Sequence, residues 1–127
     1  MIKLIYLLLF AISVLSTSVS ANDSFMLNSI EEAKNLASIT NKPLLIIFGS
    51  DYCKFCQELK KDILSKKLSP DIDKYIICYI DLETAEHIKK KYNVSMIPDS
   101  RILIKDKEIK KIKGYSKNNY LKWLIKK

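Results

Sequence analysis

Residues 42–60 contain an apolar run that leads directly into two cysteines separated by two residues. Pro43 marks the start, and the five apolar residues 44–48 that follow are typical of a short strand covered on both faces. A polar break at residues 49–51 separates this run from Cys53 and Cys56. The apolar spacing beyond the cysteines is that of an amphipathic helix. The pattern therefore places both cysteines at a strand-to-helix junction.

The amino-terminal residues have the features of a secretory signal peptide. Lys3 gives a positive start, residues 4–15 are apolar apart from Ser13, and residues 19–21 are small. This core is short for a bilayer-spanning helix, which needs about 20 apolar residues. We expect cleavage after Ala21 and a periplasmic or secreted protein, with an uncleaved membrane anchor as the alternative.

The remainder has room for one small domain. Residues 22–28 show no clear period and predict a flexible lead-in, and residues 29–127 predict a single domain. The formal net charge is +8, but lysines are scattered through every predicted helix and the hairpin and are not gathered into one basic patch, which indicates a solvated lysine-rich surface. We expect a monomer that does not bind nucleic acid.

Helix and strand patterns alternate along this domain. Ser29 and Glu32 have capping-box spacing at the start of the first helix, and Ser116 is placed to cap the last. The predicted order is a helix (29–41), a strand (44–48), the cysteine-bearing helix, a strand (75–80), a helix (83–92), a hairpin (101–105 and 107–113) and a final helix. This α/β order predicts a central mixed four-stranded sheet with helices on both faces.

The position of the two cysteines suggests different roles for them. The free N–H groups of a helix start and the neighbouring Lys54 would stabilise a thiolate at Cys53, the expected nucleophile. Cys56, one turn deeper, would hold its proton longer and act as the resolving thiol. The spacing alone does not distinguish this exchange chemistry from a structural disulfide.

The chain resembles the thioredoxin-like family over nearly all of its predicted domain. The resemblance rests on FGSDYCKFC, on VSMIP at residues 94–98, and on the ending EIKKIKGYSKNNYLKWL. It implies a thioredoxin-like fold, no cofactor, and a cis peptide bond before Pro98. It also implies that Ile97 and Pro98 cradle an extended substrate segment and keep metal from the thiolates, with Gly114 close to the site. Tyr52 is the expected substrate platform at the rim.

Several residues depart from the family pattern. Ile47 stands where thioredoxins place a buried Asp that helps to move the proton of the resolving thiol, and Ile77 stands where its Lys partner falls. Lys54 and Phe55 replace the usual Gly-Pro and are expected to tune the cysteines. Asp99 occupies a position that is commonly Thr, and we expect it to cap a local N–H group.

Other reactive side chains have structural interpretations. Cys78 lies within the apolar run YIICYI and is expected to pack in the core. His87 is the only histidine and lies on a lysine-rich segment, so no metal site is predicted. Trp123, Tyr120 and Leu124 are expected to anchor the last helix.

The leading hypothesis is an exported thiol–disulfide oxidoreductase that reduces or exchanges disulfides through Cys53 and Cys56. Its expected partners are disulfide-containing or dithiol proteins and a membrane electron donor. Two alternatives remain: a metal-binding module in which the cysteines hold a soft ion, and a binding domain with a structural disulfide. The sequence does not determine the direction of exchange, although Ile97 resembles the reducing members.

Overall fold

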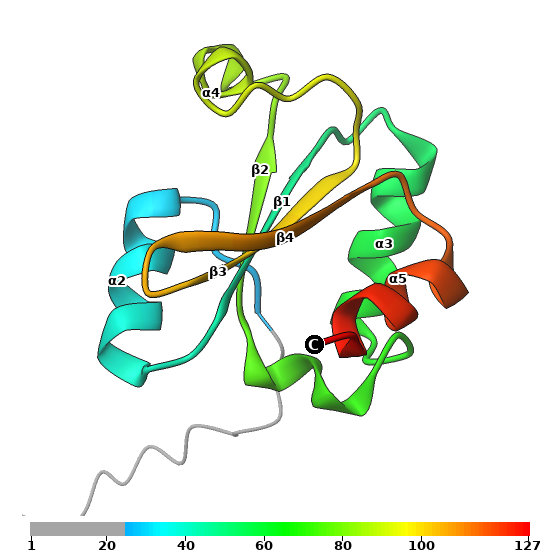
Figure 1. Cartoon of the computed structure of the whole chain (residues 1–127). Coiled ribbons are helices and arrows are strands. Elements are labelled where there is room, and N and C mark those ends of the chain that lie inside the picture. The colour runs from blue at the N-terminus through cyan, green and yellow to red at the C-terminus, as the bar shows by residue number, and fades with distance from the viewer. Residues whose placement is uncertain (1–24) are drawn as a thin grey trace, which may run out of the picture.

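The computed structural model describes residues 25–127 (Figure 1). The predicted signal peptide, residues 1–21, lies outside the described residues. No helix within the described range is long and apolar enough to cross a membrane. The elements are α2 (Ile30–Thr40), β1 (Leu44–Gly49), α3 (Lys54–Leu64), the 3₁₀ helix η1 (Pro70–Lys74), β2 (Ile76–Asp81), α4 (Glu86–Lys91), β3 (Asp99–Ile104), β4 (Lys107–Lys113) and α5 (Lys117–Ile125).

The four strands form one mixed sheet in the order β2-β1-β3-β4. β1 runs parallel to β2 and antiparallel to β3, and β3 and β4 form an antiparallel hairpin. All six residues of β1 are buried because this strand has a neighbour on each side and helices on both faces. The predicted mixed sheet and the predicted buried central strand are confirmed.

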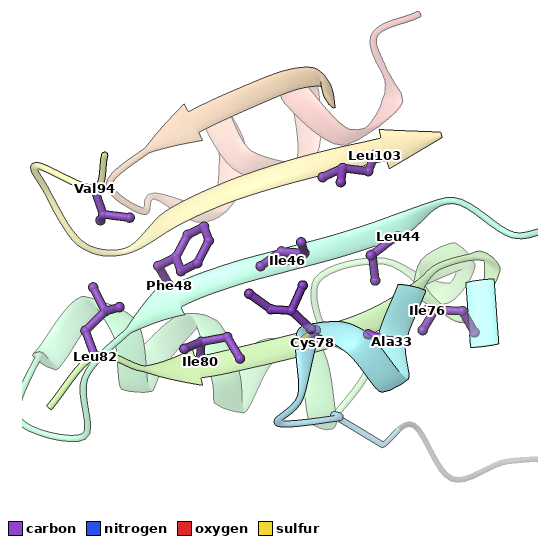
Figure 2. Packing of buried hydrophobic residues seen from close by; sticks show 11 residues of the cluster. Ala33, Leu44, Ile46, Phe48, Ile76, Cys78, Ile80, Leu82, Val94 and Leu103 are labelled. Atoms are coloured by element: carbon purple, nitrogen blue, oxygen red, sulfur yellow. The ribbon is translucent and has the colours of Figure 1, made fainter. Parts of the chain in front are cut away.

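Alternating residues of β1 enter two separate cores. Leu44, Ile46 and Phe48 pack with α2 and α4, together with Cys78 of β2 (Figure 2). Leu45 and Ile47 face the other way and pack with α3 and α5. A strand changes face with every residue, so a fully apolar strand can supply both cores. Figure 1 shows α2 on one side of the sheet and α3 with α5 on the other.

The first and last helices follow the sequence patterns closely. Ser29 accepts the Glu32 N–H at 3.3 Å, and Asn41 ends α2 in the left-handed conformation. In α5 Tyr120 and Leu124 are buried and Trp123 packs against them, as expected. The prediction of a side-chain cap at Ser116 is wrong, because Ser116 occupies the N-cap position but its side chain makes no cap hydrogen bond.

Three segments differ from the sequence predictions. Part of the predicted flexible lead-in is paired, because Leu27 forms a parallel bridge with Cys78 and covers the open edge of β2. The helix predicted over residues 83–92 is shorter, since the Asp81 carboxylate accepts the Glu83 N–H at 2.9 Å and holds a turn before α4. The apolar spacing of the cysteine-bearing helix predicts a face shared by Phe55, Leu59, Ile63 and Leu64, but only Leu59 and Ile63 are buried.

The β3–β4 hairpin turns without glycine. Lys105 and Asp106 have φ values of 51° and 64°, so both adopt the left-handed conformation of a two-residue type I′ turn. The predicted first strand of this hairpin ran from residue 101 to 105, so it began two residues after the actual start of β3 and included Lys105, which belongs to the turn. Asp99 and Ser100 are polar, which concealed their pairing with Phe48 and Ile47 in the buried sheet.

Candidate active site

The loop between β1 and α3 is held in place by Ser50. The Ser50 hydroxyl accepts the Tyr52 N–H at 3.1 Å and donates to the Glu83 carboxylate at 3.4 Å. The Ser50 carbonyl accepts the Cys53 N–H at 3.2 Å and the Gln57 amide at 3.4 Å. Three of these bonds connect Ser50 to the following loop and the first turn of α3, and the fourth connects it to the turn after β2. Ser50 therefore fixes the direction in which the chain enters the cysteine-bearing helix.

Cys53 is the N-cap of α3, and its side chain faces the free N–H groups of the helix start. Its sulfur accepts the Cys56 N–H at 3.3 Å, and the two cysteines form a disulfide with a Cα–Cα distance of 5.2 Å. Cys53 is half-buried, whereas Cys56 is 0% exposed. The accessible thiol is thus the one at the positive end of the helix, where a thiolate is stabilised.

The rim around Cys53 is apolar and accessible. Tyr52 is 90% exposed and Phe55 is 55% exposed. Lys54, between Cys53 and Phe55, is also exposed. The sequence identified Tyr52, Lys54 and Phe55, but it did not single out Met96, which is 55% exposed and lines the neighbouring cleft with Ser50.

The loop before β3 lies beside the cysteine loop. Ile97 and Ser50 line the same cleft of about 310 Å³, together with Glu83 and Glu86. The Ile97–Pro98 peptide bond is cis, Pro98 is fully buried, and its carbonyl accepts the Gly114 N–H at 2.7 Å. Gly114 has φ +81°, a conformation that favours glycine. The segments that the resemblance associated with the site therefore lie next to one another in the structure.

The interior beneath the cysteines is apolar at the two positions where thioredoxins have an acid–base pair. Ile47 and Ile77 are 0% and 4% exposed. The residue opposite Ile47 in the parallel register is Tyr79. Burial, followed by the charges of Asp51 and Asp81, raises the pKa of Tyr79 to about 12. Tyr79 therefore stays protonated at neutral pH and supplies no base.

The expectation that Asp99 caps a local N–H group is wrong. Its carboxylate is fully buried and forms a two-point ion pair with Arg101, at 3.0 Å to Nε and 3.1 Å to Nη2. Residues two apart in a strand share a face, so this i, i+2 spacing was the signal that could have revealed the pair. Arg101 also donates to the Tyr92 carbonyl at 2.7 Å and lies over the Phe48 ring, 5.1 Å from its centroid.

Gly49 is required by the packing of Tyr79. A Cβ at position 49 would lie 2.8 Å from the ring carbon Cζ of Tyr79 and closer still to its hydroxyl. We expect Gly49→Ala to lower the free energy of unfolding by about 1–3 kcal/mol through overpacking. Urea unfolding measures this loss. Tyr79→Phe removes the nearest atom, so the same substitution should cost less in that background; an equal cost in both backgrounds would contradict the contact.

Cys78 is buried as predicted and is not disulfide-bonded. Burial raises the pKa of its thiol from 9.0 to about 12. Ionisation then favours the unfolded chain, so the stability linked to Cys78 is complete below about pH 9 and is lost as the pH rises toward 12. We expect the urea midpoint to fall more steeply between pH 9 and 11 in the wild type than in Cys78→Val. Parallel pH profiles would refute this linkage.

Metal ligands do not gather around the site. Between residues 25 and 127, no group of three or more His, Cys, Asp or Glu side chains is arranged to hold a metal ion. The two cysteines by themselves provide two thiolate donors. Their arrangement at a helix start, one accessible and one buried, allows a disulfide to be formed and opened in sequence.

Comparison with known proteins relates this fold to one family. The family profile described as thioredoxin-like domain matches residues 30–127. Among solved structures, a wild-type thioredoxin h from poplar has a TM-score of 0.66 at 18% identity, covering 74% of this chain and 83% of its own. Fasciola hepatica thioredoxin gives 0.65 at 16%, covering 80% and 96%. Trxlp from Edwardsiella tarda gives 0.67 at 14%, covering 80% and 100%. No curated protein matches the sequence.

Proposed function

The chain belongs to the family of thioredoxin-like domains, and from this premise we propose that it is an exported thiol–disulfide oxidoreductase that reduces or exchanges disulfides in proteins. The observation that carries the proposal is the asymmetry of the cysteine pair. Cys53 caps the positive end of α3 and is accessible, whereas Cys56 is buried one turn into the helix. One thiol is suited to attack a substrate, and the other is suited to release it.

In the reducing direction the reaction has two exchange steps. The Cys53 thiolate attacks one sulfur of a substrate disulfide, forming a mixed disulfide and releasing the first substrate thiolate. Cys56 then loses its proton and attacks the Cys53 sulfur, which releases the second substrate thiolate and closes the Cys53–Cys56 disulfide. Two electrons pass to the substrate, and its two sulfurs each take up a proton. Exchange in the opposite direction reverses these steps.

Proton transfer in the second step proceeds without a carboxylate at the position of Ile47. Ile47 occupies the place from which such a group would act, and Tyr79 opposite it is protonated at neutral pH. The proton of Cys56 therefore passes to the departing substrate thiolate or to water admitted with the substrate. This route predicts that substrates with more basic leaving thiols accept the proton directly.

The surrounding residues have proposed roles in substrate contact. Tyr52 provides an exposed aromatic surface beside Cys53, and Lys54 and Phe55 tune the pair from the first turn of α3. Ile97 and Pro98 lie in the neighbouring loop, where their backbone would receive an extended substrate segment. A membrane electron donor is the proposed source of electrons after export.

Catalysed insulin reduction tests the proposal. With dithiothreitol as the electron source, we expect the protein to accelerate insulin precipitation in proportion to its concentration. The absence of acceleration, together with one soft metal ion bound per chain or chain pair in protein purified under reducing conditions, would instead favour a metal-binding module.

A further inference from the structure

The positive charge of the chain is concentrated in its last quarter. Residues 25–100 contain eleven lysines and eleven acidic residues, so their formal charges cancel. Residues 101–127 contain ten Lys or Arg against two Asp or Glu, a net charge of +8. Lysines occur in both parts of the chain, as expected, but in residues 101–127 few acidic residues offset them.

This segment forms one edge of the molecule. It contains most of β3, all of β4 and all of α5, and β4 is the terminal strand of the sheet (Figure 1). Both acidic residues of the segment are in ion pairs, Asp106 with Lys34 at 3.0 Å and Glu108 with Arg101 at 3.4 Å. Lys110 is also engaged, since it donates to the carbonyls of Trp123 and Leu124 at the end of α5.

Seven lysines of residues 101–127 are exposed and have no side-chain hydrogen bond or ion pair among the interactions of residues 25–127: Lys105, Lys107, Lys111, Lys117, Lys122, Lys126 and Lys127. Three of them lie on the terminal strand β4 or at the start of the helix that follows it, namely Lys107, Lys111 and Lys117. We call these three residues the basic edge. Lysines on a terminal strand also prevent pairing with other sheets. That role does not account for a positive excess that continues beyond the strand into α5.

The basic edge leads into the candidate active site. Lys113, at the end of β4, donates to the Ser95 hydroxyl at 2.8 Å, and Ser95 lies in the loop that contains Ile97 and Pro98. The next residue, Gly114, donates its N–H to the Pro98 carbonyl at 2.7 Å. An acidic segment that follows the basic edge would therefore arrive at the loop beside Cys53.

We propose that the basic edge binds acidic segments of the protein substrates and steers their disulfides to Cys53. This inference rests on the proposed oxidoreductase function and specifies its substrate class. Complementary charge raises the rate of encounter more than it raises the final affinity, and the effect weakens as salt screens the charges. The substrates predicted to react fastest are disulfides flanked by Asp and Glu.

Two synthetic peptide disulfides of equal length provide the test, one flanked by Asp and Glu and the other by Lys. A small neutral disulfide, 2-hydroxyethyl disulfide, reports the intrinsic reactivity of Cys53. For the reduced wild-type protein at low salt we expect the acidic peptide to react at least about tenfold faster than the basic one. In 0.5 M salt we expect that ratio to fall to within about twofold.

Two triple Lys→Glu variants show which lysines produce the preference for the acidic peptide. The variant Lys107→Glu/Lys111→Glu/Lys117→Glu should lose the preference for the acidic peptide and keep the wild-type rate with the neutral disulfide. The control Lys61→Glu/Lys67→Glu/Lys90→Glu changes the net charge equally at exposed lysines of other elements and should keep the preference. An equal loss in both variants would assign the preference to net charge and overturn the proposal.

Two further outcomes would also overturn it. Equal rates with the two peptides in the wild type, combined with salt-sensitive sedimentation on phosphatidylglycerol vesicles, would assign the basic edge to an anionic membrane. Equal rates with the two peptides and no vesicle binding would show that the lysines of the basic edge are only solvated surface residues. If neither the peptides nor the neutral disulfide react, the proposed oxidoreductase function itself fails, and the inference fails with it.

Discussion

Cys53→Ser is expected to abolish catalysed insulin reduction, lowering the rate by at least about 10³-fold as the loss of a covalent nucleophile does. Serine at the N-cap still accepts the N–H of residue 56, so the start of α3 is preserved. The loss therefore reports chemistry and not unfolding. Turbidity of precipitating insulin in the presence of dithiothreitol measures the rate.

Two matched variants complete this prediction. Cys56→Ser should accumulate a mixed disulfide between Cys53 and the substrate, visible as a mass increase that reductant removes. Cys78→Val, which changes a buried cysteine outside the pair, should retain wild-type activity. Full activity of Cys53→Ser would show that Cys53 is not the nucleophile, and full activity of Cys56→Ser would show that a second protein thiol is not needed.

Asp99→Ala is expected to lower the free energy of unfolding by up to about 3–5 kcal/mol, because the Arg101 guanidinium loses its buried carboxylate partner and keeps only the exposed carboxylate of Glu108 at 3.4 Å. Arg101 is only 7% exposed and cannot recover this interaction from water without moving. Arg101→Met should cost a similar amount by leaving Asp99 unpaired. Urea unfolding at neutral pH measures both losses.

The double variant Asp99→Ala/Arg101→Met combines the two single substitutions and measures the coupling between the two charges. Replacing both charges with apolar side chains removes the unpaired ion, so the double variant should be more stable than either single variant. Losses that add independently would contradict a coupled ion pair. Because Asp99 follows Pro98 directly, the insulin assay on the double variant also shows whether the pair positions that loop.

The sequence was sufficient for the architecture because its strongest patterns are local. The apolar run before the cysteines predicted a buried central strand, and capping and turn residues predicted most helix limits. Errors arose where a side chain outside the pattern controlled the backbone. The Asp81 carboxylate delays the start of α4, and Leu27 pairs with the edge of β2 although its surroundings have no period.

The parts of the site formed by residues close together in the sequence were predictable. Cys53 and Cys56 are at the expected helix start, and their difference in burial follows from one helical turn. Contacts that depend on strand register were not predictable. The need for Gly49 arises from Tyr79, which reaches it only because β1 and β2 pair in this register. The buried pair of Asp99 and Arg101 likewise required knowledge of where β3 begins.

The equilibrium reduction potential of the Cys53–Cys56 pair tests the central claim most directly. Protein carrying Cys78→Val, equilibrated in glutathione or dithiothreitol buffers and then alkylated, gives the reduced fraction by mass. An oxidoreductase requires a reversible two-electron transition between about −270 and −120 mV, the range of known exchange catalysts. A disulfide that stays closed in buffers poised below about −300 mV would be structural and would contradict the proposed function.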